Sequence, residues 1–77
     1  MITVKYQSKD PNEGWLAQTL PFVPGKRMKY YLKDLRMIAL SLRCDVIHEL
    51  SREKIRLNVV PPDGSSIIMQ PAGRGGV

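Results

Sequence analysis

Cysteine and histidine are almost absent from this chain of 77 residues, which contains one of each. A single cysteine, Cys44, excludes a disulfide within the chain, which fits a reducing compartment or a protein that needs no disulfide. One cysteine and one histidine, His48, cannot complete a four-ligand zinc site. The sequence therefore predicts no internal disulfide, no metal site and no cofactor.

Long apolar runs are also missing. No run approaches the roughly 20 residues that a membrane-spanning helix needs. The opening residues MITVKY are not a charged start followed by an apolar stretch, the pattern of a secretory signal peptide. We therefore expect no membrane partner, no secretion by a signal peptide, and a location in the cytoplasm or in a particle assembled inside the cell.

Groups that could carry catalysis are few. Cys44 and His48 are four residues apart, so a helix through both would allow a Cys–His pair. The sequence offers no evident oxyanion donors or third orienting group, and cysteine is more often a small buried residue. We expect no catalytic residues and a protein that is not an enzyme.

Positive charge is present in excess, and it is concentrated in one segment. Residues 26–43 contain six basic residues and one acid, Asp34, whereas the rest of the chain is balanced. The basic residues are Lys26, Arg27, Lys29, Lys33, Arg36 and Arg43. Such a patch is either a solvated surface or a docking surface for an acidic protein or nucleic acid. Tyr30 lies near it and could stack on a base.

The same segment has the strongest periodicity in the sequence. Apolar side chains recur at helical spacing, and most of the basic residues fall on the opposite side. The apolar positions are Met28, Tyr31, Leu32, Leu35, Ile38, Ala39 and Leu42. This pattern predicts one amphipathic helix over residues 28–43.

Four other segments are rich in β-branched and apolar residues and are predicted as strands. Pro21 suggests a sheet edge or a bulge in the second of them, and residues 61–64 (PPDG) predict a turn joining the last two as a hairpin. The predicted strands are residues 2–7, 15–23, 54–60 and 65–70. Residues 44–50 fit either a short strand or a continuation of the helix. Residues 1–70 are thus predicted to form one domain, followed by a mobile glycine-rich tail over 71–77.

Two stretches resemble the ubiquitin-like superfamily. In FVPGKRMKYYLKDL (22–35) a strand passes through a Pro-Gly turn into a helix, and DGSSIIMQPAGRGG (63–76) is similar to the end of small sulfur-carrier proteins. The resemblance implies an α+β fold of the β-grasp type, with one amphipathic helix packed on a mixed sheet of four to five strands. It further implies that the Gly76 carboxylate could be activated by an ATP-dependent enzyme, after removal of Val77.

These observations leave three functions open. The first is a non-catalytic interaction or assembly subunit that docks through the basic helix face, a sheet edge and the tail residues Arg74, Gly75 and Gly76. Such a subunit could be a structural component of a larger complex, such as a phage particle. The second is a ubiquitin-like or sulfur-carrier protein, and the third is an accessory nucleic-acid binder. Trp15 is expected at the edge of the core, or at an interface if it is exposed.

Overall fold

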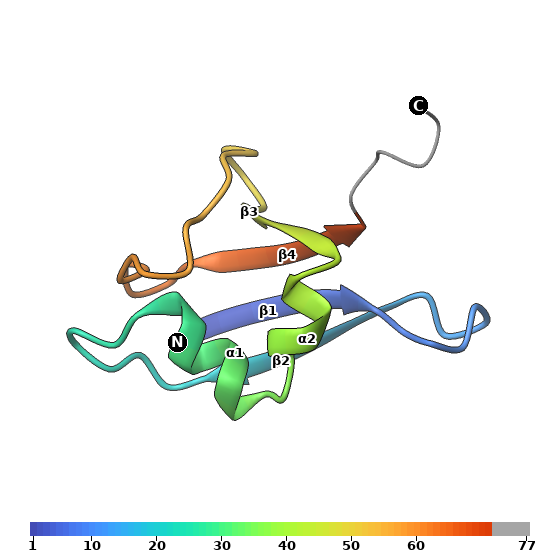
Figure 1. Ribbon diagram of the computed structural model, residues 1–77, viewed down its shortest axis with the longest axis horizontal. Helices are drawn as coiled ribbons and strands as arrows, with labels where there is room; N and C mark the ends of the chain where they lie inside the picture. Colours follow the sequence, from blue (N-terminus) through green and yellow to red (C-terminus); the bar gives the residue numbers. More distant parts are fainter. Residues whose placement is uncertain (72–77) are drawn as a thin grey trace.

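The computed structural model describes residues 1–71, which form a small α+β domain with a four-stranded mixed sheet and two short helices (Figure 1). The elements are β1 (Ile2–Gln7), β2 (Trp15–Leu20), α1 (Met28–Asp34), α2 (Ile38–Ser41), β3 (Cys44–His48) and β4 (Ser66–Pro71). The strand predicted over 2–7 is confirmed. Residues 44–50 were predicted as a strand or as a continuation of the helix, and Cys44–His48 form a strand. The second strand ends at Leu20, directly before Pro21.

The first and last strands lie side by side at the centre of the sheet. The strand order is β2-β1-β4-β3, in which β1 is parallel to β4 and each is antiparallel to its outer neighbour. The two ends of the described chain are therefore joined through the middle of the sheet. This arrangement leaves β2 and β3 as the edge strands.

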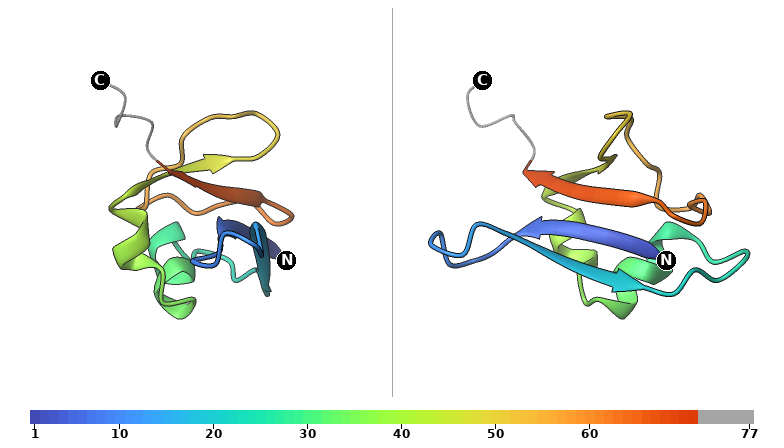
Figure 2. Two further views of the ribbon diagram at one scale, coloured as in Figure 1. Left: turned by 90° about the vertical axis from the view of Figure 1, so that its right-hand side faces the viewer. Right: turned by 180° about the vertical axis from the view of Figure 1, so that it is seen from behind.

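Alternation along the central strands separates a buried face from an exposed one. Val4 pairs with Ile67, and both are completely buried, whereas Lys5 and its partner Ile68 are only half-buried. Because successive side chains of a strand point to opposite faces, the first pair belongs to the core and the second to the other face. Both helices lie on the same side of the sheet (Figure 2), and they cover the buried face.

Helix α1 is held to the sheet by its apolar side and by the backbone at its start. Tyr31 and Leu32 are fully buried, and the Tyr31 hydroxyl accepts a hydrogen bond from the Val23 N–H at 2.8 Å. No side chain of residues 1–71 caps the helix N-terminus. Instead, the N–H groups of Met28 and Lys29 donate to the carbonyls of Val59 and Leu57, both at 2.8 Å. These bonds satisfy donors that a helix leaves unpaired in its first turn.

The single helix predicted over 28–43 is wrong, because the chain breaks it into α1 and α2. Arg36 has φ of 59°, and the Met37 N–H donates to the Leu32 carbonyl at 2.8 Å while the Arg36 N–H donates to the Lys33 carbonyl at 3.0 Å. This pair of bonds is a Schellman motif, which ends a helix with one residue in the left-handed conformation. Glycine is the usual residue there, so an arginine gives no sequence signal of the break.

The strand predicted over 54–60, and the hairpin with it, is also wrong. Only Lys54 makes a bridge, to Ile47, and the following residues form an irregular segment. Ile55 and Leu57 pack partly against the core, which explains the alternating pattern, but the Leu57 carbonyl is bound to the start of α1. The turn is correct: the Ser65 N–H donates to the Pro62 carbonyl at 3.1 Å. It leads, however, into a strand that pairs with β1 and β3.

Candidate docking surface

The structure divides the six predicted basic residues into two groups. Lys26 forms an ion pair with Asp34, and its ammonium lies 4.7 Å from the centre of the Tyr31 ring. The ammonium of Lys29 lies 5.2 Å from the centre of the Tyr30 ring. Cation–π contact of this kind occupies both lysines within the chain.

The other four basic residues are exposed and have no carboxylate within ion-pair distance among residues 1–71. We refer to them as the helix-layer cations: Arg27, Lys33, Arg36 and Arg43. Arg27 directly precedes α1 and Lys33 lies in its last turn. Arg36 lies in the turn between the helices and Arg43 in the connection to β3. They are therefore spread along the helix layer, from the start of α1 to the connection into β3.

Most of the acids are already engaged. Glu49 pairs with Lys5 at 2.7 Å, Asp45 with Lys54 at 3.7 Å, and Asp63 with the N-terminal ammonium at 2.6 Å, in addition to Asp34 with Lys26. Hydrogen bonds from Lys5 and Ser66 hold the pKa of Glu49 below its ordinary value. The acids of the described chain thus leave the helix-layer cations without an internal partner.

A groove of about 630 Å³ lies between the β1–β2 hairpin and the segment from Leu35 to Arg43. Its apolar lining includes Tyr6, Leu16 and Leu40, all half-buried. We refer to this cavity as the hairpin–helix groove. The Gln18 side chain donates to the Tyr6 hydroxyl at 2.9 Å, which fixes the tyrosine beside the groove.

Three cations line the hairpin–helix groove: Arg36, Arg43 and Lys9. The first two come from the predicted basic segment, whereas Lys9 was not predicted as a site residue. Lys9 lies in the polar turn between β1 and β2, and no linear pattern connects it with Arg36. Only the folding of the hairpin beside α2 brings them to one groove. Among the described residues, Glu13 is the only acid in the lining.

The two sheet edges differ in what borders them. The outer edge of β3 is bordered by the chain that follows it, since the Ile55 N–H donates to the Val46 carbonyl at 2.8 Å. No strand among residues 1–71 pairs with the outer edge of β2. The side chain of Trp15, at the start of β2, is 45% exposed. The edge of β2 is therefore the one open to an added strand.

Cys44 and His48 do not come together. Both lie on the extended strand β3, where a separation of four residues corresponds to about 13 Å. Burial and the neighbouring carboxylate of Asp45 raise the pKa of the Cys44 thiol, which disfavours the thiolate. Within residues 1–71, no three histidine, cysteine or acidic side chains are grouped to hold a metal ion.

The tail residues Arg74, Gly75 and Gly76 lie outside the described residues. No helix in the described part of the chain is both long and apolar enough to span a membrane.

Comparisons with protein-family models, with curated proteins and with solved structures find no match to this chain.

Proposed function

We propose that the protein is a non-catalytic interaction subunit that docks through the helix layer onto an acidic protein surface within a larger assembly. The observation that carries this proposal is the uncompensated charge of the helix layer. Four of the seven acids are paired with other groups, and its four cations have no ion-pair partner among residues 1–71. Exposed charge of one sign steers association and selects partners of opposite sign.

We also propose that the fold is of the β-grasp type. The support is the parallel central pair β1 and β4, with antiparallel strands on both sides and the helices between β2 and β3 in sequence. Small β-grasp proteins of this sort resemble components of larger complexes. The assembly could thus be a phage particle, with this protein as one of its structural components. The fold alone does not assign the function.

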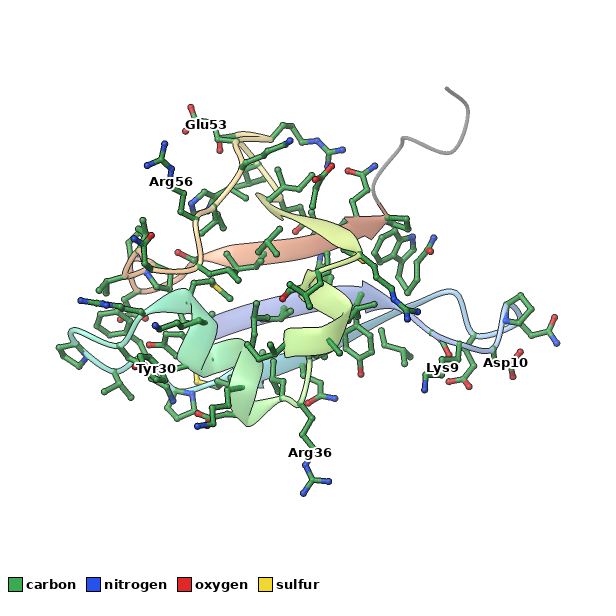
Figure 3. The ribbon with its side chains drawn as sticks, in the orientation of Figure 1. Lys9, Asp10, Tyr30, Arg36, Glu53 and Arg56 are labelled. Atoms are coloured by element: carbon green, nitrogen blue, oxygen red, sulfur yellow. The ribbon has the colours of Figure 1, made fainter. Side chains whose placement is uncertain are left out.

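The proposal is tested by reversing the helix-layer charge. The double variant Lys33→Glu/Arg36→Glu should block incorporation of a tagged chain into its native assembly. The control is Lys54→Glu/Arg56→Glu, which changes the net charge equally and disturbs only the exposed pair of Lys54 with Asp45, a kind of pair that adds little to stability. In Figure 3 Arg56 lies in the upper part of the molecule and Arg36 at the bottom. Equal incorporation of both double variants would contradict docking through the helix layer.

A second candidate is a ubiquitin-like or sulfur-carrier protein. It is favoured by the position of β4, a central strand that ends at Pro71, five residues before Gly76. Its chemistry would begin with hydrolysis of the Gly76–Val77 bond. The free carboxylate would then attack the α-phosphate of ATP, with loss of pyrophosphate.

The variant Gly76→Ala separates the two candidates. A carrier should lose adenylation in the presence of its activating enzyme, because glycine is needed where a narrow channel admits no side chain. A docking subunit should enter its assembly as the wild type does. Adenylation of Gly76→Ala at the wild-type rate would contradict the carrier.

A further inference from the structure

We propose that the hairpin–helix groove is the docking site, and that it takes an acidic protein segment which inserts an apolar side chain and pairs its carboxylates with Arg36 and its neighbours. This inference rests on the proposed function and names the site and the chemistry of the partner.

The groove has the size and lining of a binding site. Its volume of about 630 Å³ is within the range of pockets that bind ligands. Tyr6, Leu16 and Leu40 are half-buried, so their apolar surface remains partly accessible to a partner. An inserted apolar side chain would remove that surface from water, which favours binding.

The charge at the groove selects an acidic partner. Lys9, Arg36 and Arg43 reach it from three different segments of the chain, against the one acid Glu13. None of these four side chains makes an ion pair with another residue of the described chain. Carboxylates of a partner would bind arginine through charge-assisted hydrogen bonds, which are stronger than neutral ones.

The backbone at Arg36 gives a second and independent indication. This residue ends the Schellman motif of α1 with φ of 59°, a conformation that costs free energy for any residue with a Cβ and little for glycine. Its side chain extends away from the sheet (Figure 3) and makes no hydrogen bond with residues 1–71. Within the described chain the arginine side chain thus makes no hydrogen bond or ion pair that would favour it over glycine at this position.

Arg52 provides the internal comparison. Apart from Arg36, it is the only non-glycine residue of the described chain with a positive φ, which is 64°. Unlike that of Arg36, its guanidinium donates a hydrogen bond to the Gln70 side chain at 3.2 Å. The strain at Arg52 is therefore accompanied by a bond within the fold. We infer that the contact which compensates the strain at Arg36 is made with the partner.

The lining favours a protein segment over nucleic acid. Its apolar residues in the described chain are mostly aliphatic, and the one aromatic ring among them, Tyr6, is bound through its hydroxyl to Gln18. Readers of single-stranded nucleic acid present aromatic rings on which successive bases stack. A lining that combines aliphatic side chains with cations instead fits a peptide that alternates acidic and apolar side chains.

The experiment is a selection from a random library of displayed 12-residue peptides on the wild-type protein. The expected result is enrichment of peptides that combine acidic and apolar residues. A selected peptide should shift the backbone amide signals of Leu16, Leu40 and Arg43 in an NMR titration. Enrichment of peptides without acidic residues, shifts confined to other regions, or no enrichment at all would overturn the proposal.

Two glycine variants separate binding from folding. Arg36→Gly should weaken the selected peptide at least about tenfold, as expected for loss of a charge-assisted hydrogen bond, and should unfold at a temperature equal to or above that of the wild type. Arg52→Gly relieves the same backbone strain and should leave peptide affinity unchanged. Equal affinities of Arg36→Gly and the wild type would overturn the role of Arg36.

The same variants distinguish this inference from the proposed function. If Arg36→Gly is incorporated normally while Lys33→Glu/Arg36→Glu is not, docking through the helix layer stands and the groove is wrong. If neither variant affects incorporation, the proposed function fails as well. Binding of a single-stranded DNA probe that falls steeply with salt and competes with the peptide would overturn the assignment to a protein partner.

Discussion

On the face of the sheet beneath the helices, Val4, Ile67 and Met69 are buried, whereas on the opposite face Lys5 and Ser66 are partly exposed and both bind Glu49. The same alternation along the strands thus produces an apolar side and a polar side. Apolar burial is the main favourable contribution to folding, and exposed ion pairs add little. The stability of this domain should therefore depend on the helix-covered face, and changes elsewhere should be tolerated.

The largest effect on the free energy of unfolding is expected from substitutions beneath the helices. Leu32→Ala leaves a cavity beneath α1 and should lower the free energy of unfolding by about 2–5 kcal/mol, because Leu32 is completely buried. Leu42 belongs to the same apolar pattern but is 78% exposed. Leu42→Ala should change the free energy of unfolding by less than about 0.5 kcal/mol. Denaturant unfolding measures both, and similar losses would contradict the arrangement of the core.

A smaller effect is expected at Tyr31, which joins α1 to the chain before it. Tyr31→Phe removes the acceptor of the Val23 N–H and should lower the free energy of unfolding by about 1–3 kcal/mol. Tyr30 is 45% exposed and has no hydrogen bond through its hydroxyl in the described chain. Tyr30→Phe is thus the matched control. If thermal unfolding shows equal shifts for both variants, the Tyr31 hydrogen bond does not contribute.

The smallest effect on stability is expected on the face of the sheet opposite the helices, and this effect depends on pH. The pKa of Glu49 is lowered in the folded protein, chiefly by the hydrogen bonds from Lys5 and Ser66. A lowered pKa gives stability that is present above the unfolded pKa of about 4.3 and is lost as the pH falls through the folded pKa. Glu49→Gln should therefore be less stable than the wild type at pH 7, and the difference should shrink with acidification.

Thermal unfolding from pH 7 downwards measures this difference. The exposed acid Glu53 has no ion pair in residues 1–71, and Glu53→Gln is the control. If the difference in unfolding temperature between Glu49→Gln and the wild type grows on acidification, the carboxylate of Glu49 does not stabilise the fold as described.

The sequence predicted the central strands well because alternation and burial agree there. It did not predict the break between α1 and α2, because Arg36 occupies the position at the helix end where glycine is the usual residue. The false strand at 54–60 has a similar origin: Ile55 and Leu57 alternate because they pack on the core, although the backbone beside them binds elsewhere. Alternation reports burial, and it identifies a strand only when the backbone also pairs.

The candidate site was predictable only in part. Charge counting identified Arg36 and Arg43, because local composition is visible in the sequence. Lys9 was missed, since it reaches the hairpin–helix groove only after the β1–β2 hairpin folds beside α2. The engagement of Lys26 with Asp34 likewise depends on the fold.

The most direct test of the central claim is the mass of the protein isolated from its native source, measured first without denaturation and then after it. Docking in an assembly predicts a large complex that releases a chain with Val77 intact on denaturation. A chain that lacks Val77, or that carries sulfur or a covalently attached partner at Gly76, would contradict this account and favour the carrier.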